Sequence, residues 1–164
     1  MGFQKLPRPV HICNCGNHAW TALTHGYVTL VSPEDAELLR DRAWYAKVSR
    51  RTVYAKSDKY LHRKILPDAD RIDHESGIGL DNRRPNLRPA TNQQNCQNGS
   101  AHRDSGSKFK GVSWYKNYRL WRAAIYVGGK QKCLGYFSGE VEAAKTYDAA
   151  AIKHFGPFAR VNFP

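Results

Sequence analysis

A short polar stretch divides this chain of 164 residues into two parts, and the division constrains the fold more than any other feature. Residues 99–107, with the sequence GSAHRDSGS, have no periodic apolar positions and are typical of a linker. Because a chain of this length suffices for two small domains, each part must build its own modest core. We therefore predict an α+β protein with one domain over residues 1–98 and another over residues 108–164.

The charge of the chain indicates what it binds. Lys and Arg outnumber Asp and Glu by 26 to 14, which gives a formal net charge of +12. A surplus of this size on a small protein favours a polyanionic partner, and nucleic acid above all, because neutralised phosphates release condensed counterions. A generic basic surface with no specific partner, or affinity for acidic membranes, is the alternative. From Ser107 onward ten basic residues stand against three acidic ones, so the C-terminal part is the more basic per residue.

Composition also excludes several classes of protein. Hydrophobic residues make up 41% of the chain, so we expect it to fold rather than stay disordered. No run of about 18 apolar residues could cross a membrane, and the N-terminus lacks the apolar segment of a secretory signal. Of the four cysteines only Cys13 and Cys15 are close in sequence, and they are too near for an ordinary disulfide, which favours a reducing, cytoplasmic compartment.

Local patterns outline the N-terminal part. Ser32, Pro33 and two acidic residues predict a helix start, with the helix running to about Arg42. Three β-like runs follow, at residues 44–48, 52–56 and 60–66. Residues 67–86 are rich in turn formers, and a short helix is predicted from about Thr91.

The C-terminal part reads as three strands and a helix. The strands are predicted at residues 108–113, 121–127 and 132–137, and the Gly128-Gly129 pair indicates a hairpin turn between the last two. Apolar residues recur at steps of three or four over residues 139–154, as in an amphipathic helix. We predict a small antiparallel sheet packed on this helix.

The chemistry centres on Asp73 and His74. Hydrolysis of a phosphodiester needs a water activated near neutral pH and positive charge on the phosphate and leaving oxygens. A neutral, oriented histidine can act as the base. A hard cation such as Mg²⁺ prefers one or two protein oxygens and keeps its other positions for water and phosphate. A single Asp-His pair is more often a surface turn, so the wider pattern has to decide.

That wider pattern runs from Asp73-His74 through Gly79-Leu80-Asp81-Asn82-Arg83 to Asn86-Leu87-Arg88. It resembles the HNH endonucleases of phage and intron origin, the homing-endonuclease type, over about residues 60–98. The resemblance implies a ββα-metal core, the His-Me finger, and 5′-phosphate and 3′-hydroxyl products.

The same resemblance implies the site residues. His74 matches the general base, and Asn86, twelve positions on, matches the Asn that orients the base and steadies the loop. Asn95 matches the helix position that supplies a second metal ligand beside Asp73. An Asn at that position favours Mg²⁺ or Mn²⁺ over zinc.

Two alternatives and four accessory residues stay open in this pattern. Asn92, one turn before Asn95, competes for the helix ligand, and Asn82 competes for the central Asn, although a turn suits it better. His62 matches a His-Arg pair that recurs in this family on the strand before the Asp-His pair, and its role is left open. The possible accessory residues are His62, Arg63, Arg83 and Arg84.

Residues 107–164 resemble a second family, the APETALA2-type DNA-binding domain of plant transcription factors and of phage and bacterial HNH nucleases. The resemblance rests on a series of segments in one order: Phe109-Lys110-Gly111-Val112, Trp121-Arg122-Ala123-Ala124-Ile125, Leu134-Gly135-Tyr136-Phe137, Tyr147-Asp148-Ala149-Ala150 and Asn162-Phe163. It implies that the outward face of the sheet enters the major groove.

Side-chain alternation selects the residues on that face. On the middle strand Trp121, Ala123 and Ile125 should face the helix, and their neighbours should face outward. Lys and Arg can pair with phosphate or guanine, and Gln with adenine. The predicted DNA-binding residues are Lys110, Ser113, Tyr115, Arg122, Tyr126, Gln131 and Lys132, with Lys116, Arg119 and Lys130 near the rim.

A separate cluster, His11, Cys13, Cys15 and His18, could bind Zn²⁺. Its spacing is tighter than in the usual zinc knuckle, and a loosely packed N-terminus with reduced thiols is the alternative.

Together these patterns predict a monomeric, metal-dependent endonuclease that cuts double-stranded DNA and acts on no small-molecule substrate. The linker would let one domain hold DNA while the other cuts. A catalytically inactive, sequence-specific DNA-binding regulator is the first alternative, and an RNA-binding protein is the second.

Overall fold

The structure is a computed structural model that describes residues 6–50, 52–100 and 106–164. Its contacts divide the chain into two compact units, Met1–Asn92 and Gln93–Pro164, and each is described by itself. Most of the predicted linker, residues 101–105, lies outside the described residues. Among the described helices, none has the length and apolar character needed to span a bilayer.

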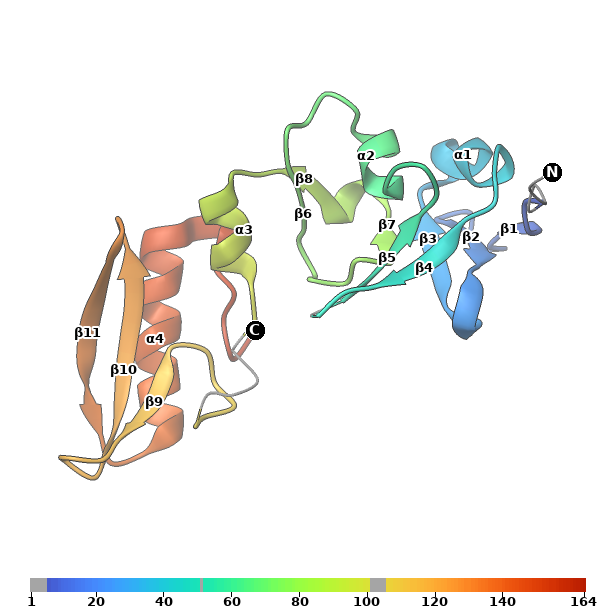
Figure 1. The fold of residues 1–164 in the computed structure, drawn as a ribbon. Coiled ribbons are helices and arrows are strands. Elements are labelled where there is room, and N and C mark those ends of the chain that lie inside the picture. Colours follow the sequence, from blue (N-terminus) through green and yellow to red (C-terminus); the bar gives the residue numbers. More distant parts are fainter. Residues whose placement is uncertain (1–5, 51, 101–105) are drawn as a thin grey trace. The chain divides into compact units, whose positions relative to one another are not determined.

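The first unit is built on a four-stranded sheet in the order β1-β2-β3-β7 (Figure 1). The first three strands pair antiparallel, and the short β7 runs parallel to β3, with Leu30 opposite Asp81 and Val31 opposite Asn82. This pairing joins segments about 50 residues apart, which places the end of the turn-rich stretch against the N-terminal strands. The bounds are β1 Val10–Ile12, β2 Ala19–Ala22, β3 Val28–Val31 and β7 Asp81–Asn82, with the 3-10 turn Thr24–Gly26 before β3.

Two hairpin-like pairs complete the first unit, β4 with β5 and β6 with β8, both antiparallel. The predicted helix after Ser32 is present as a 3-10 turn followed by α1. The bounds are the turn Pro33–Asp35, α1 Ala36–Arg40, β4 Tyr45–Val48, β5 Val53–Lys56, α2 Leu61–Ile65, β6 Ile72–His74, the 3-10 turn Arg84–Asn86 and β8 Leu87–Pro89.

The strand predicted at residues 60–66 is wrong, because Leu61–Ile65 forms the helix α2. Leu61 and Ile65, four residues apart, are 0% and 4% exposed and share one side of that helix. Burial of this pair outweighs the β-like composition of the segment, and it moves His62 from a strand to a helix.

The core of the first unit joins these pieces. Leu39, Trp44, Leu61 and Val31 are among its buried members. The Trp44 indole donates a hydrogen bond to the Leu38 carbonyl at 2.9 Å, as buried Trp N–H groups usually require.

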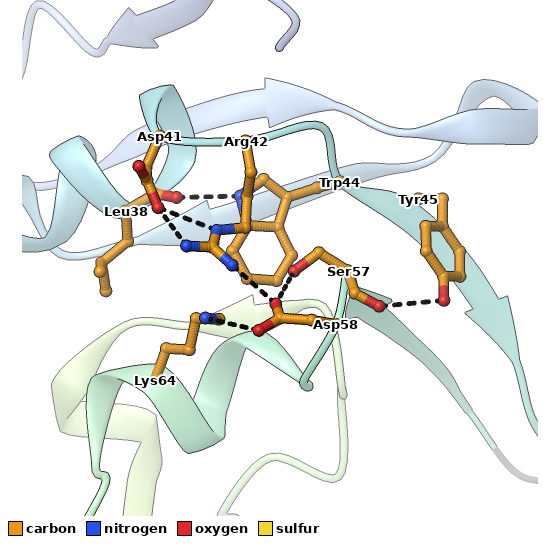
Figure 2. A network of polar contacts seen from close by, with 8 residues as sticks. All are labelled: Leu38, Asp41, Arg42, Trp44, Tyr45, Ser57, Asp58 and Lys64. Carbon is orange, nitrogen blue, oxygen red and sulfur yellow. Dashed lines mark hydrogen bonds and ion pairs between the residues drawn. The ribbon is translucent and has the colours of Figure 1, made fainter. Parts of the chain in front are cut away.

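An exposed ion-pair network covers one edge of this core (Figure 2). The Asp58 carboxylate lies between Arg42, at 2.8 Å, and Lys64 of α2, at 3.2 Å. Arg42 also pairs with Asp41, and the Tyr45 hydroxyl donates to the Ser57 carbonyl. The hydrogen bond from the Ser57 hydroxyl, together with those from Lys64 and Arg42, holds the pKa of Asp58 well below its usual range. The network ties the β4–β5 hairpin to α2, although exposed pairs contribute little stability each.

The second unit contains the predicted three strands and helix, although its first strand lies later in the sequence than predicted, and the unit also includes residues 93–98 of the helix predicted for the first domain. Three antiparallel strands form a sheet in the order β11-β10-β9, and the long helix α4 lies along one face of it (Figure 1). The bounds are α3 Asn92–Asn98, β9 Val112–Tyr115, β10 Leu120–Val127, β11 Lys130–Phe137, α4 Glu140–Phe155 and the 3-10 turn Gly156–Phe158.

Small residues let α4 approach the sheet closely. Ala123, Ala143, Ala144 and Ala151 are all fully buried between helix and strands. The buried Asp148 accepts hydrogen bonds from the backbone N–H and side-chain amide of Asn162, both at 2.8 Å, which fixes the end of the chain against α4.

Candidate functional site

His74 ends strand β6, and its cross-strand neighbour on β8 is Leu87. The chain between the two strands forms the turn-rich loop of residues 75–86. His74 is 7% exposed, so this is not the surface histidine that a single Asp-His pair usually signifies.

A buried chain of hydrogen bonds fixes the His74 ring. The Thr29 hydroxyl donates its only proton to the Leu80 carbonyl at 2.9 Å. Its oxygen must therefore accept from the Asn82 amide, which lies 2.9 Å away. This leaves the carbonyl oxygen of the Asn82 side chain toward His74 Nε2, at 3.2 Å. Thr29 and Asn82 are both 0% exposed, so water cannot replace either bond.

The direction of these bonds determines the protonation of His74. Nε2 must carry a proton to donate to Asn82, so in the neutral ring Nδ1 bears the lone pair. Burial lowers the pKa of His74 below its ordinary 6.5 and outweighs the opposing effects of Asn82, Asp73 and Asp81. The ring is therefore a neutral, oriented base at neutral pH.

Asn86 has one of the two roles predicted for it. Its side chain donates to the Asp81 carbonyl at 2.7 Å and accepts from the Ser76 N–H at 2.9 Å. Asn86 therefore steadies the loop, as predicted, while the hydrogen bond to the base comes from its competitor, Asn82. The pattern of spacing could not separate the two, because β7 brings Asn82 to His74 only through its pairing with β3.

The predicted metal ligands are divided between the units. Asp73 is 6% exposed, and its Oδ2 accepts from Arg88 at 2.8–2.9 Å. Its carboxylate is the donor type that Mg²⁺ prefers, but a cation would share it with Arg88. Asn95 and its competitor Asn92 lie on α3, across which the unit boundary falls, with Asn95 in the second unit. The first unit alone therefore brings one of the two predicted ligands beside His74.

The accessory His62 is part of the same site. Its ring lies 5.0 Å from that of His74 in an edge-on arrangement and stacks on Tyr60 at 5.4 Å. Tyr54, which the sequence did not single out, packs 5.8 Å from His74. Within the described chain, His62 Nδ1 is a buried atom without a hydrogen-bond partner.

The accessory arginines serve mainly the fold. Arg83 pairs with Asp81 at 2.7 Å and Arg84 with the buried Asp35 at 2.7 Å, so both guanidinium groups brace the loop. Arg63 is exposed on α2.

Acid should weaken the first unit through His62. Burial lowers the pKa of His62 to about 3 from 6.5, so between these values the unfolded chain binds the proton that the folded chain refuses. Stability is fully present above pH 6.5 and falls below it, by at most about 1.4 kcal/mol per pH unit for this group. Thermal unfolding across a pH series measures this slope.

His62→Phe keeps the stacked ring and removes the titrating nitrogens, so its unfolding temperature should fall less with acid. His154→Phe, at an exposed position on α4, is the matched control and should retain the wild-type slope. Equal slopes in His62→Phe and the wild type would contradict the assignment.

The outward face of the second unit's sheet forms a second candidate site. Cross-strand register places Ser113, Arg122 and Tyr136 side by side on that face, since Ala123 and Ile125 on β10 are buried against α4. Tyr126, 65% exposed, lies opposite Gln131 farther along. The predicted residues Ser113, Arg122, Tyr126 and Gln131 therefore share this face.

Three tyrosines make the centre of this face aromatic. The rings of Tyr115, Tyr118 and Tyr136 lie 5.1–5.2 Å from one another. Beside them Arg122 Nε is buried without a hydrogen-bond partner among the described residues. The Arg122 guanidinium, placed beside these three tyrosine rings, is suited to bind an anionic group or the edge of a guanine base.

Two of the predicted DNA-binding lysines are not on this face. Lys110 Nζ donates to the Gln97 carbonyl of α3, and the backbone of Lys110 is bonded to Asn162. Lys132 lies opposite Ile125, on the helix side, because the register set by the Gly128-Gly129 turn alternates regularly and places Lys132 on the opposite face from its neighbour Gln131.

Comparisons with known proteins find relatives over part of the chain. The chain is 41% identical over 61 residues to APETALA2-like protein 2 of Oryza sativa subsp. indica, which covers 37% of this chain and 14% of that protein. It is 41% identical over 63 residues to the ethylene-responsive transcription factor WRI1 of Arabidopsis thaliana, covering 38% of this chain and 14% of that protein. The chain is similar in part to APETALA2-like proteins.

A phage protein matches as well. Protein 3.8 of Escherichia phage T7 is 35% identical over 66 residues, which covers 40% of this chain and 54% of that protein. The chain thus spans from about a seventh to about half of the length of these relatives. No protein-family model matches the chain, and no solved structure matches it.

Proposed function

We propose that this protein binds duplex DNA through the outward face of the β9-β10-β11 sheet. The observation that carries the proposal is Arg122, whose Nε has no partner in the described chain and lies beside three clustered tyrosines. The net charge of +12 and the similarity to APETALA2-like proteins and to a protein named a transcription factor support it. Arg122 would contact a guanine edge or a phosphate, and Gln131 and Tyr126 would extend the contact.

Arg122→Ala should weaken the binding of the full chain to its preferred duplex by roughly 5- to 150-fold, as expected for one good guanine contact. The preferred duplex is selected from a random library with the wild-type chain, and affinity is measured by fluorescence anisotropy. Lys153→Ala removes one charge from the exposed side of α4 and is the matched control, expected to change affinity less than about twofold at equal salt.

If a folded Arg122→Ala chain binds the duplex with wild-type affinity, the outward face of the sheet is not the DNA-binding surface. Competition with single-stranded RNA separates the alternative, since stacking of unpaired bases on the tyrosines would make RNA the better competitor.

We further propose that the first unit hydrolyses phosphodiester bonds of that DNA, as an HNH-type endonuclease with a ββα-metal core. The observation that favours this second function is the state of His74, whose ring burial keeps neutral and whose hydrogen bond to Asn82 leaves the lone pair on Nδ1.

In this mechanism His74 Nδ1 takes the proton of a water that attacks phosphorus in line with the leaving 3′ oxygen. Asn82 keeps the ring oriented, and Asn86 keeps the loop folded around it. Asp73 would supply an oxygen ligand to Mg²⁺ or Mn²⁺, whose charge would stabilise the phosphate and the leaving oxygen. A plasmid-nicking assay with either cation tests the activity.

If neither wild-type cleavage nor any cation dependence is found while DNA binding persists, the protein is a DNA-binding regulator with an inactive first unit. The similarity to transcription factors already favours that alternative more than it favours cleavage.

A further inference from the structure

A second group of chemically reactive side chains lies far along the sequence from His74, in the turn between β1 and β2. Ile12 pairs with Ala19, and residues 13–18 close the hairpin. The Cys13 N–H donates to the His18 carbonyl at 2.9 Å, and the Gly16 N–H donates to the Cys13 carbonyl at 2.8 Å. Gly16 adopts φ +72°, a conformation that favours glycine and lets the turn fold back on itself.

This turn brings three metal-binding atoms together. Sγ of Cys13 lies 2.9 Å from Sγ of Cys15, which lies 3.7 Å from Nδ1 of His18, and the three atoms are all within 4.8 Å of one another. All three residues are close to the surface, and both cysteines are in the reduced state. The fourth residue of the predicted set, His11, is not in this group, because its ring stacks on Trp20 at 4.3 Å.

We propose that Cys13, Cys15 and His18 bind one Zn²⁺ ion. Tetrahedral zinc with ordinary bond lengths sets its sulfur ligands about 3.8 Å apart and a sulfur and a nitrogen ligand about 3.5 Å apart. The observed separation of Cys15 and His18 already fits, and the two sulfurs need to move apart by less than 1 Å. Two thiolates and an imidazole are a soft to borderline set that selects zinc over magnesium. A water completes the coordination.

The ion would act on the sheet that orients His74. β1 is a three-residue edge strand, and a short two-stranded hairpin is marginal without a further constraint. Zinc would close the β1–β2 turn, and β2 pairs with β3, which carries Thr29. The proposal does not depend on the proposed function, because a metal clip on this hairpin would serve a regulator equally well.

The test measures metal on the full chain purified without a histidine tag. Elemental analysis after dialysis should give ~1 zinc ion per chain, and cobalt in place of zinc should give a thiolate-to-cobalt charge-transfer band. The double variant Cys13→Ser/Cys15→Ser should abolish both signals. His18→Ala should remove most of the bound metal. The matched control replaces the exposed Cys96 and Cys133 with Ser and should leave both signals unchanged.

Circular dichroism of each variant shows whether it is folded, and cobalt titration of the wild type provides a readout that needs no variant. A wild-type chain that takes up no zinc or cobalt would overturn the proposal. So would equal uptake by the Cys13/Cys15 variant, or a Cys13–Cys15 disulfide in chain purified under reducing conditions.

Discussion

Replacing His74 with alanine should lower Mg²⁺-dependent nicking of plasmid DNA by about 10²- to 10⁴-fold, the range that a general base contributes. The substitution removes Nδ1, whose lone pair would accept the proton from water. Nε2 is the nitrogen that is hydrogen-bonded to Asn82. Binding to duplex DNA should stay within about twofold of the wild type, because the proposed binding face lies in the second unit. The measurement is the initial rate of conversion of supercoiled to nicked plasmid, with binding measured in parallel.

A second variant tests the orientation of the base. Asn82→Asp keeps the shape of the side chain and places a carboxylate 3.2 Å from Nε2, which should raise the pKa of His74. Cleavage requires the neutral ring, so the wild type should stay active below pH 6.5 and this variant should lose activity at higher pH. Equal nicking by the wild type and His74→Ala, or none by either, would eliminate the enzymatic proposal and leave DNA binding intact.

Gly111→Ala should unfold most of the second unit. The residue adopts φ +76°, and an added Cβ would lie 1.9 Å from Cδ2 of Tyr147, whose side chain is 3% exposed in the core. Neither the backbone nor the buried Tyr147 ring can move without a large cost in free energy. We therefore expect the free energy of unfolding to fall by about 3–5 kcal/mol. For a domain of this size that is comparable to its whole stability. Thermal unfolding should show loss of the second unit's transition, and duplex binding should disappear with it.

Gly128→Ala is the matched control for this effect. Gly128 has φ +58° but no atom within 4 Å of the added Cβ, so its substitution should cost only about 1 kcal/mol. Similar losses at the two positions would mean that backbone conformation, rather than the contact with Tyr147, decides the outcome. Retention of the first unit's transition in Gly111→Ala would show that the two units unfold separately.

The second unit was predictable because its signals are local. The period of the residues in α4, the Gly128-Gly129 turn and the alternation on β10 each lie within one element, and the structure confirms all three. The prediction put the adjacent residues Gln131 and Lys132 in one set, although alternation places them on opposite faces of β11, and Lys132 is on the helix side. Lys110 was missed as an anchor because its partner Gln97 lies before the linker.

The first unit was less predictable because its contacts are long-range. The neighbouring pair Asp73 and His74 could be identified, but their partners depend on folding. Arg88 reaches Asp73 through the pairing of β6 with β8, and Asn82 reaches His74 through the pairing of β7 with β3. Helix α2 was predicted as a strand because its residue composition is β-like, although the spacing of Leu61 and Ile65 is that of a helix.

The parallel pairing of β3 with β7 means that the nuclease-like motif is not a self-contained module. A fragment starting at Tyr60 would contain every motif residue, yet it would lack Thr29 and with it the anchor of the Asn82 amide. Its histidine ring could then turn over and exchange its two nitrogens. The smallest piece that could carry out the proposed cleavage must begin before β3. Transplanting residues 60–98 into another protein would transfer the motif without the hydrogen bond that orients its histidine.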